Sequence, residues 1–86
     1  MSYETTFQIE ILREYGSSIS AGFYHYANNN KINLEERDHP INKARIEARL
    51  LANKLTSSLD EEIQAIKQRL HELKAYLYEV NPNAVI

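Results

Sequence analysis

The residues of this 86-residue sequence with the clearest binding chemistry are an aromatic pair and two arginines. Tyr24 and His25 are adjacent in the stretch GFYHYANNN, and Arg45 and Arg49 are four residues apart. Four residues is about one turn of an α-helix, so two guanidinium groups at this spacing can hold one phosphate or carboxylate. An aromatic ring with a polar handle gives binding area at low entropic cost. We therefore predict Tyr24, His25, Arg45 and Arg49 as binding residues.

Catalytic and metal-binding patterns are missing from the sequence. His25, His39 and His71 are far apart in the chain, and there is no cysteine to join them as a metal ligand. The acidic run Asp60 to Glu62 is explained by a helix N-terminus, and the two glycines cannot build a phosphate-binding loop. We predict no catalytic residue, no metal site and no cofactor, and hence a protein that is not an enzyme.

Length and composition predict a single domain, residues 1–86. The chain is 43% hydrophobic and 26% charged, which is typical of a folded globular protein. The net charge of -2 gives no general attraction to nucleic acid or to anionic lipid. The N-terminal stretch MSYETTFQIE has neither a basic region nor a long apolar run. We expect a cytoplasmic protein without a membrane segment.

The second half predicts an antiparallel helical hairpin with helices at about 39–56 and 58–80. Apolar residues three and four apart mark the first helix at Ile41, Ala44, Ala48, Leu51 and Leu55. A second stripe runs without a fault through Leu59, Ile63, Ile66, Leu70, Leu73, Leu77 and Val80. The short linker between them requires the two stripes to face each other.

The ends of these helices carry recognisable signals. Pro40 suits a first helical turn, and Asp38 or His39 can cap it. Ser58 and Glu61 have the spacing of a capping box for the second helix, and Asn81 with Pro82 ends it. The first helix carries an excess of basic residues and the second an excess of acids, which predicts attraction across the hairpin.

The first half, residues 3–28, has two interpretations. As helices, one stripe contains Tyr3, Phe7, Ile11 and Tyr15, Gly16 ends that helix, and a second stripe contains Ile19, Phe23, Tyr26 and Ala27. As strands, Phe7, Ile9 and Ile11 alternate with polar residues and Gly16-Ser17 forms a hairpin turn, giving an α+β fold. We favour a mainly α fold, with two short N-terminal helices, a loop at 29–38, the hairpin at 39–80 and a tail at 81–86.

Ile46 and Leu50 lie nearly opposite the Ile41/Leu51 stripe of the first hairpin helix. A second apolar face on one helix must be covered by something. We expect the N-terminal half to cover it, and the alternative is a surface for self-association or for a partner. Ile46 and Leu50 are therefore the candidate interface residues.

These observations favour a small interaction protein that self-associates, as a homodimer or larger assembly, and acts as adaptor, regulator or inhibitor of another protein. One alternative is an oligomeric helical sponge for an anionic small ligand or nucleotide, of the phage anti-defence type. In outline the hairpin is similar to that of phage proteins that sequester cyclic nucleotides, although no specific motif carries the similarity. A third hypothesis is a weak nucleic-acid binder.

Overall fold

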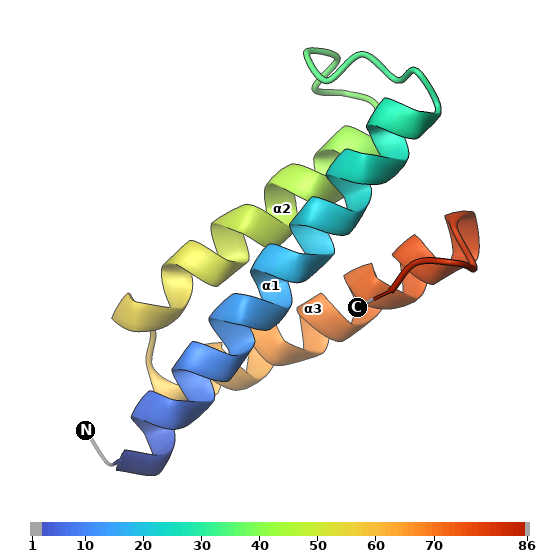
Figure 1. The fold of residues 1–86 in the computed structure, drawn as a ribbon. Helices are drawn as coiled ribbons and strands as arrows, with labels where there is room; N and C mark the ends of the chain where they lie inside the picture. The colour runs from blue at the N-terminus through green and yellow to red at the C-terminus, as the bar shows by residue number, and fades with distance from the viewer. Residues whose placement is uncertain (1–2, 86) are drawn as a thin grey trace.

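The protein is mainly helical. The computed structural model describes the backbone of residues 3–85 and the side chains of residues 6–85. Its elements are α1 (Tyr3–Asn29), α2 (Pro40–Lys54), a 3₁₀ turn η1 (Leu55–Ser57) and α3 (Asp60–Val80) (Figure 1). No strand occurs within residues 3–85. The mainly α prediction with a C-terminal helical hairpin is confirmed, and the alternative of an N-terminal β-hairpin is wrong.

The N-terminal half is one long helix, so the predicted break at Gly16 is wrong. Gly16 is buried against α2, and a Cβ atom placed on it would lie 2.9 Å from the Cβ of Ala52 and 3.4 Å from the carbonyl oxygen of Ala48. A glycine inside a helix costs roughly 0.5–1 kcal/mol relative to alanine. Here the missing side chain lets α1 and α2 approach closely, and that packing offsets the cost.

The buried face of α1 also differs from the predicted one in its first half. Ile9 is only 5% exposed, whereas Phe7 is 57% and Ile11 49% exposed. The buried stripe is continuous at helical spacing through Ile9, Leu12, Gly16, Ile19, Phe23 and Ala27. The predicted second-half stripe is confirmed, but Phe7 and Ile11 lie outside the core. The side chain of Tyr3 is outside the described residues.

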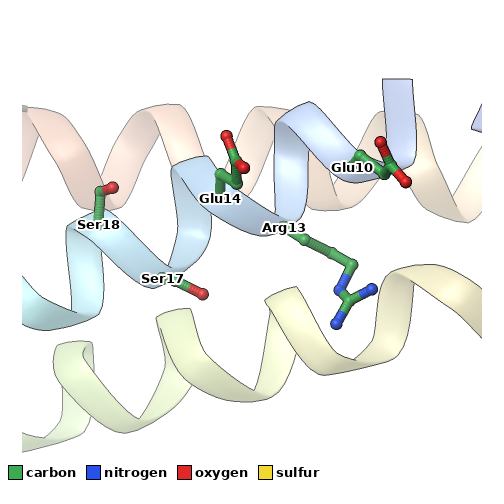
Figure 2. A pocket seen from close by; sticks show the side chains of 5 residues that line it. All are labelled: Glu10, Arg13, Glu14, Ser17 and Ser18. Carbon is green, nitrogen blue, oxygen red and sulfur yellow. The ribbon is translucent and has the colours of Figure 1, made fainter. Parts of the chain in front are cut away.

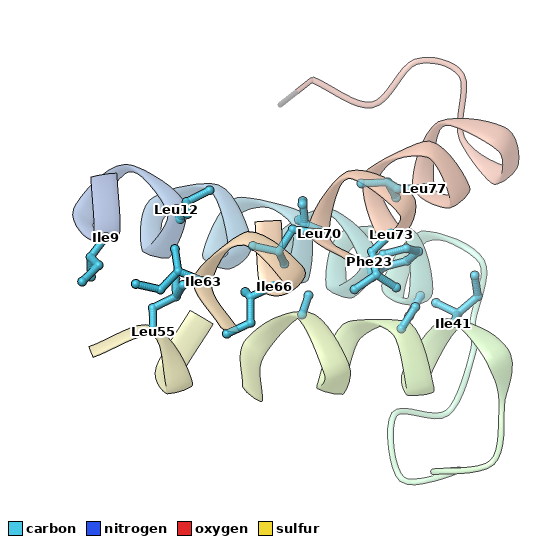
Figure 3. Packing of buried hydrophobic residues seen from close by; sticks show 14 residues of the cluster. Ile9, Leu12, Phe23, Ile41, Leu55, Ile63, Ile66, Leu70, Leu73 and Leu77 are labelled. Carbon is cyan, nitrogen blue, oxygen red and sulfur yellow. The ribbon is translucent and has the colours of Figure 1, made fainter. Parts of the chain in front are cut away.

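The core lies where the three helices meet (Figure 3). The predicted seam of α3 is buried at Ile63, Ile66, Leu70, Leu73 and Leu77. The prediction of Leu59 as its first member is wrong, because this residue precedes α3 and is 74% exposed. α1 runs beside α2, and α3 leans away from α2 after the turn, as Figure 1 shows. As a result, α3 contacts α1 more extensively than it contacts α2. α1 therefore shares the seam that the sequence alone assigned to the hairpin.

The connection between α1 and α2 is fixed by side chains of the second helix. The fully buried Asn42 donates from Nδ2 to the carbonyl oxygens of Asn33 at 2.8 Å and Glu36 at 2.9 Å. His39 caps α2, because its Nδ1 accepts a hydrogen bond from the backbone N–H of Ile41 at 3.2 Å. The expected capping role of His39 is confirmed.

The turn into α3 uses a cap one residue later than predicted. The backbone N–H of Leu59 donates to the carboxylate of Glu62 at 3.0 Å, so the acid that reaches back is Glu62 and not Glu61. The hydroxyl of Ser58 instead donates to the carbonyl oxygen of Lys54 at 2.7 Å, which satisfies the end of α2. At the other end of α3, the backbone N–H of Asn81 donates to the carbonyl oxygen of Leu77, as expected for the residue that ends the helix.

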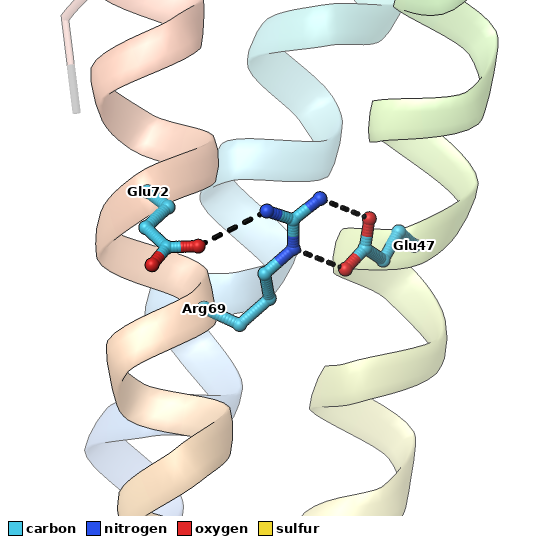
Figure 4. Close-up of polar contacts among 3 residues, drawn as sticks. All are labelled: Glu47, Arg69 and Glu72. Atoms are coloured by element: carbon cyan, nitrogen blue, oxygen red, sulfur yellow. Dashed lines mark hydrogen bonds and ion pairs between the residues drawn. The ribbon is translucent and has the colours of Figure 1, made fainter.

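An ion-pair cluster joins α2 to α3 with the opposite polarity from the predicted attraction. Arg69 of α3 donates from Nε and Nη2 to the carboxylate of Glu47 of α2 at 2.5 and 2.9 Å (Figure 4). Its Nη1 donates to Glu72, one turn along α3, at 3.0 Å. The acid comes from the basic helix and the base from the acidic one. Within residues 6–85 none of the basic residues of α2 makes an ion pair.

Candidate functional site

Three of the four predicted binding residues meet at one groove between α1 and α2. Tyr24 of α1 and Arg45 and Arg49 of α2 line a hollow of about 280 Å³, and the other lining residues are Ser17, Ser20 and Ala21. The antiparallel course of α1 and α2 brings these residues together although they are more than 20 positions apart. His25 does not line the groove, but its ring lies edge-on to that of Tyr24, with centroids 5.7 Å apart.

Arg45 occupies the centre of this surface. Its backbone carbonyl oxygen accepts a hydrogen bond from the hydroxyl of Ser20 at 3.0 Å, which ties α2 to α1. Its Nη2 reaches the carbonyl oxygen of Leu34 at 3.5 Å, the long limit of a hydrogen bond. Its Nε is buried and has no hydrogen-bond partner. The backbone of Arg45 is thus fixed to α1, whereas its guanidinium makes one long hydrogen bond and leaves most of its donors unused.

Ile46 and Leu50 are not covered by the N-terminal half, so that expectation is wrong. Leu50 is 60% exposed on the face of α2 turned away from α1. Ile46 is half-buried, and it lines a second hollow with Leu34, Glu35, Arg37 and Arg45. α1 packs instead on the stripe of α2 that contains Ala48 and Ala52, the two residues in contact with Gly16. The second apolar face of α2 therefore remains accessible.

A further exposed apolar face, which sequence reasoning assigned to the core, lies on the first half of α1. Phe7 and Ile11 are one turn apart on the side of α1 away from the core. A shallow hollow lined by Glu10, Arg13, Glu14, Ser17 and Ser18 continues along the same helix. Figure 2 shows Arg13 and Ser17 on the side of α1 that faces α2, and Glu14 and Ser18 on the other side.

The sequence contained a signal for this face. Extending the 3–4 spacing of Ile19, Phe23 and Ala27 backwards through Gly16 reaches Leu12 and Ile9, and it leaves Phe7 and Ile11 outside. The expected break at Gly16 concealed that signal. Phe7 and Ile11 are the functional candidates that the sequence analysis missed.

The histidines have structural neighbours. His39 caps α2. Nδ1 of His71 shares a hydrogen bond with the hydroxyl of Tyr15 at 3.0 Å, which links α3 to α1. Burial, helped by the neighbouring Tyr78, raises the pKa of Tyr15 above its ordinary value. Across the described residues, no group of three or more histidine and acidic side chains is placed to hold a metal ion.

None of the helices in the described part of the chain combines the length and the apolar character needed to cross a membrane. The structure presents three accessible surfaces. The α1 face is defined as Phe7 and Ile11 with Glu10 and Glu14. The α2 face is defined as Ile46 and Leu50. The arginine groove is defined by its lining residues Arg45, Arg49, Tyr24, Ser17, Ser20 and Ala21.

Comparison with known proteins gives the family. Neither a curated protein nor a solved structure matches the chain. A family described as bacterial epsilon antitoxin matches residues 1–80, which include all three helices. An antitoxin is a small protein that binds another protein and inhibits it, in agreement with the predicted regulator or inhibitor class. The chain belongs to the bacterial epsilon antitoxin family.

Proposed function

We propose that the protein inhibits a toxin protein by binding it through the α1 face, without chemistry of its own. The observation that carries the proposal is the exposure of Phe7 and Ile11 one turn apart on a helix whose opposite side is anchored in the core. Large apolar side chains exposed together on a small protein mark an interaction surface more often than chance. Paired anchors at this spacing are typical of a helix that lies in a partner's groove.

The surroundings of these anchors specify the chemistry of the partner surface. Glu10 and Glu14 are exposed next to Phe7 and Ile11 on α1, so the rim of the surface is acidic. An interface of this kind has an apolar centre, which supplies most of the affinity, and a polar rim, which supplies specificity. We expect the toxin to present an apolar cleft edged with basic side chains, and we expect the complex to form in the cytoplasm.

Self-association remains part of the proposal and uses the α2 face. Leu50 is the most exposed of the apolar side chains on α2. The α2 face and the α1 face lie on different helices, and each is turned away from the core. Two copies joined through Ile46 and Leu50 could therefore each bind a toxin molecule at the same time.

The test is a pair of matched surface variants, measured with the purified toxin by calorimetry. We expect Phe7→Asp combined with Ile11→Asp to weaken toxin binding by at least about 100-fold. Each anchor would become buried in the complex, and an anchor of this kind contributes on the order of 2 kcal/mol or more to binding. Leu50→Asp should retain toxin binding and reduce the molar mass measured by light scattering. Circular dichroism must show native helix content in both. Unchanged toxin binding by the folded double variant would sink the assignment of the α1 face.

A further inference from the structure

We propose that the arginine groove between α1 and α2 is a binding site for a phosphate dianion, either inorganic phosphate or the phosphate monoester group of a nucleotide. No residue of the α1 face and neither Ile46 nor Leu50 lines the groove, although Ser17 and Arg45 also line the hollows beside those faces. The groove is built from two helices, because Tyr24, Ser17 and Ser20 come from α1 and both arginines come from α2. Its geometry depends on the close α1–α2 contact at Gly16 and on the Ser20 hydrogen bond to Arg45.

The charge of the groove matches a dianion. Arg45 and Arg49 are one helical turn apart, a spacing at which like charges repel each other. No carboxylate lines the groove, and the ion pairs found within residues 6–85 are made by Arg69. Glu35 lines the adjoining hollow with Arg37 and Arg45, and Glu14 lines the hollow that shares Ser17 with the groove. A phosphate monoester carries a charge of about -1.5 to -2 at neutral pH, which matches the two positive charges of the groove. A ligand with a single carboxylate would neutralise only one of them.

The hydrogen-bond donors of the groove are available for the same ligand. The Ser20 hydroxyl already donates to the carbonyl oxygen of Arg45, so it serves to position that residue. Ser17 and Tyr24, which also carry hydroxyl groups, are among the lining residues of the groove. Arg45 makes one long side-chain hydrogen bond from Nη2, and its Nε is buried. Within residues 6–85, Nη1 of Arg45 and the guanidinium of Arg49 make no hydrogen bond, so they can donate charge-assisted hydrogen bonds to phosphate oxygens that enter the groove.

The size of the groove and the position of Tyr24 limit the ligand. A volume of about 280 Å³ lies just below the range of roughly 300–1,000 Å³ that is usual for pockets enclosing a whole small molecule. A phosphate group fits in a hollow of this size. Tyr24, which is 43% exposed at this surface, offers a ring on which a nucleotide base can stack.

The experiment is a titration of the full-length chain alone, so its outcome does not depend on the toxin. The probes are inorganic phosphate and adenosine monophosphate, and the readout is the Nε–Hε signals of the arginines by ¹⁵N NMR. We expect saturable shifts of the Arg45 and Arg49 signals with both probes. Arg49→Gln should weaken binding by roughly tenfold or more, the usual effect of losing a charged hydrogen-bond donor. Arg49→Lys, which keeps the charge but loses the planar fork, should show an intermediate loss.

The control is Arg13→Gln, because Arg13 is an exposed arginine of α1 beside Glu10 and Glu14 that does not line the groove. We expect it to leave phosphate affinity unchanged within about twofold, since surface charge alone has a weak effect in salt. Shifts that rise linearly without saturation, or equal losses from Arg13→Gln and Arg49→Gln, would overturn the proposal. Tyr24→Leu, which removes the ring available for base stacking, distinguishes a nucleotide ligand from inorganic phosphate. A selective loss of adenosine monophosphate affinity supports a nucleotide, and equal affinities for both probes support free phosphate.

Discussion

Gly16 of α1 lies directly against Ala52 of α2, so close that a methyl group on Gly16 would come within 2.9 Å of the Ala52 Cβ atom. Real Cβ atoms do not approach this closely, and Ala52 and Ala48 are both buried and cannot swing aside. The crossing of α1 and α2 therefore requires glycine at position 16.

A larger side chain at this crossing should destabilise the protein. We expect Gly16→Val to lower the free energy of unfolding by about 1–3 kcal/mol, because overpacking forces the two helices apart. In a chain of this size that is a drop of roughly 4–8 °C in Tm for each kcal/mol. Gly22→Ala is the matched control, since replacing a helical glycine by alanine raises helix propensity. A Gly16→Val protein with the wild-type Tm would show that α1 and α2 can separate at little cost.

Phe23 and Tyr24 are adjacent in the sequence, but Phe23 is buried and Tyr24 is exposed. Alanine substitutions at these two positions therefore test the orientation of α1. Phe23 is 0% exposed, with its ring centroid 5.7 Å from that of Tyr76. We expect Phe23→Ala to cost about 3–5 kcal/mol in urea unfolding, the usual effect of removing a buried aromatic side chain. Tyr24→Ala should change stability by less than about 0.5 kcal/mol, as is typical of surface positions. Similar losses from both variants would contradict the assigned register of α1.

The Glu47–Arg69 pair predicts a small pH dependence in the acid range. Hydrogen bonds from Arg69 hold the pKa of Glu47 below its ordinary value of 4.5, and they also raise the pKa of Arg69. A lowered carboxyl pKa contributes stability above the ordinary value, and this contribution is lost as the pH falls through the folded-state value. Because both side chains are well exposed, solvent screening limits the pair to about 0–1 kcal/mol.

The check on this pair is unfolding of Glu47→Gln and wild type at pH 7 and near pH 2. We expect the difference between them to be present at pH 7 and to shrink at the lower pH, where the wild-type carboxyl is protonated. Glu79→Gln, an exposed substitution on α3, serves as the control at both pH values. A difference that stays constant with pH would show that Glu47 acts through something other than its charge.

Tyr15 predicts a pH dependence at the alkaline end. Burial, with a contribution from Tyr78, raises its pKa above the ordinary value of 10.0. A raised pKa means that the folded protein holds the phenol proton more tightly than the unfolded chain does. This contribution to stability is fully present at pH values below the ordinary pKa of 10.0. It is lost as the pH rises through the higher pKa of the folded state.

We expect the wild type to lose stability above about pH 10 more steeply than Tyr15→Phe, measured by thermal unfolding at successive pH values. Tyr24→Phe, at an exposed tyrosine, should follow the wild-type profile. If Tyr15→Phe and wild type fall in parallel, ionisation of Tyr15 does not contribute to alkaline unfolding.

The sequence predicted those parts of the molecule in which one periodicity dominates. In α3 the apolar residues admit a single helical face, and all five central seam positions from Ile63 to Leu77 are buried. In the first half of α1, Phe7, Ile9 and Ile11 are all apolar, so either side of the helix could be the core. The choice depends on Gly16, whose role is decided by its contact with α2 and not by its neighbours in the chain. Local sequence cannot reveal such a contact.

The same distinction applies to the candidate site. Spacing on one helix correctly grouped Arg45 with Arg49, and the fold then placed Tyr24 beside them. The Ile46/Leu50 face was recognised from its position opposite the main stripe, but the element expected to cover it packs on the other side. Predictions within a helix were therefore more successful than predictions of which helix covers which face.

The unbroken course of α1 also sets how far apart its two surfaces lie. Ile11 and Tyr24 are 13 positions apart in α1, which corresponds to about 20 Å along the axis at the helical rise per residue. Electrostatic influence between exposed charges fades over roughly 8 Å at physiological ionic strength. An anion near Tyr24 is therefore beyond that range of Ile11, whereas Glu14 of the α1 face is only three positions, about 4.5 Å along the axis, from Ser17 of the groove. Communication between an anion near Tyr24 and the apolar anchor Ile11 would have to be mechanical, by rotation or bending of α1 as a single rod.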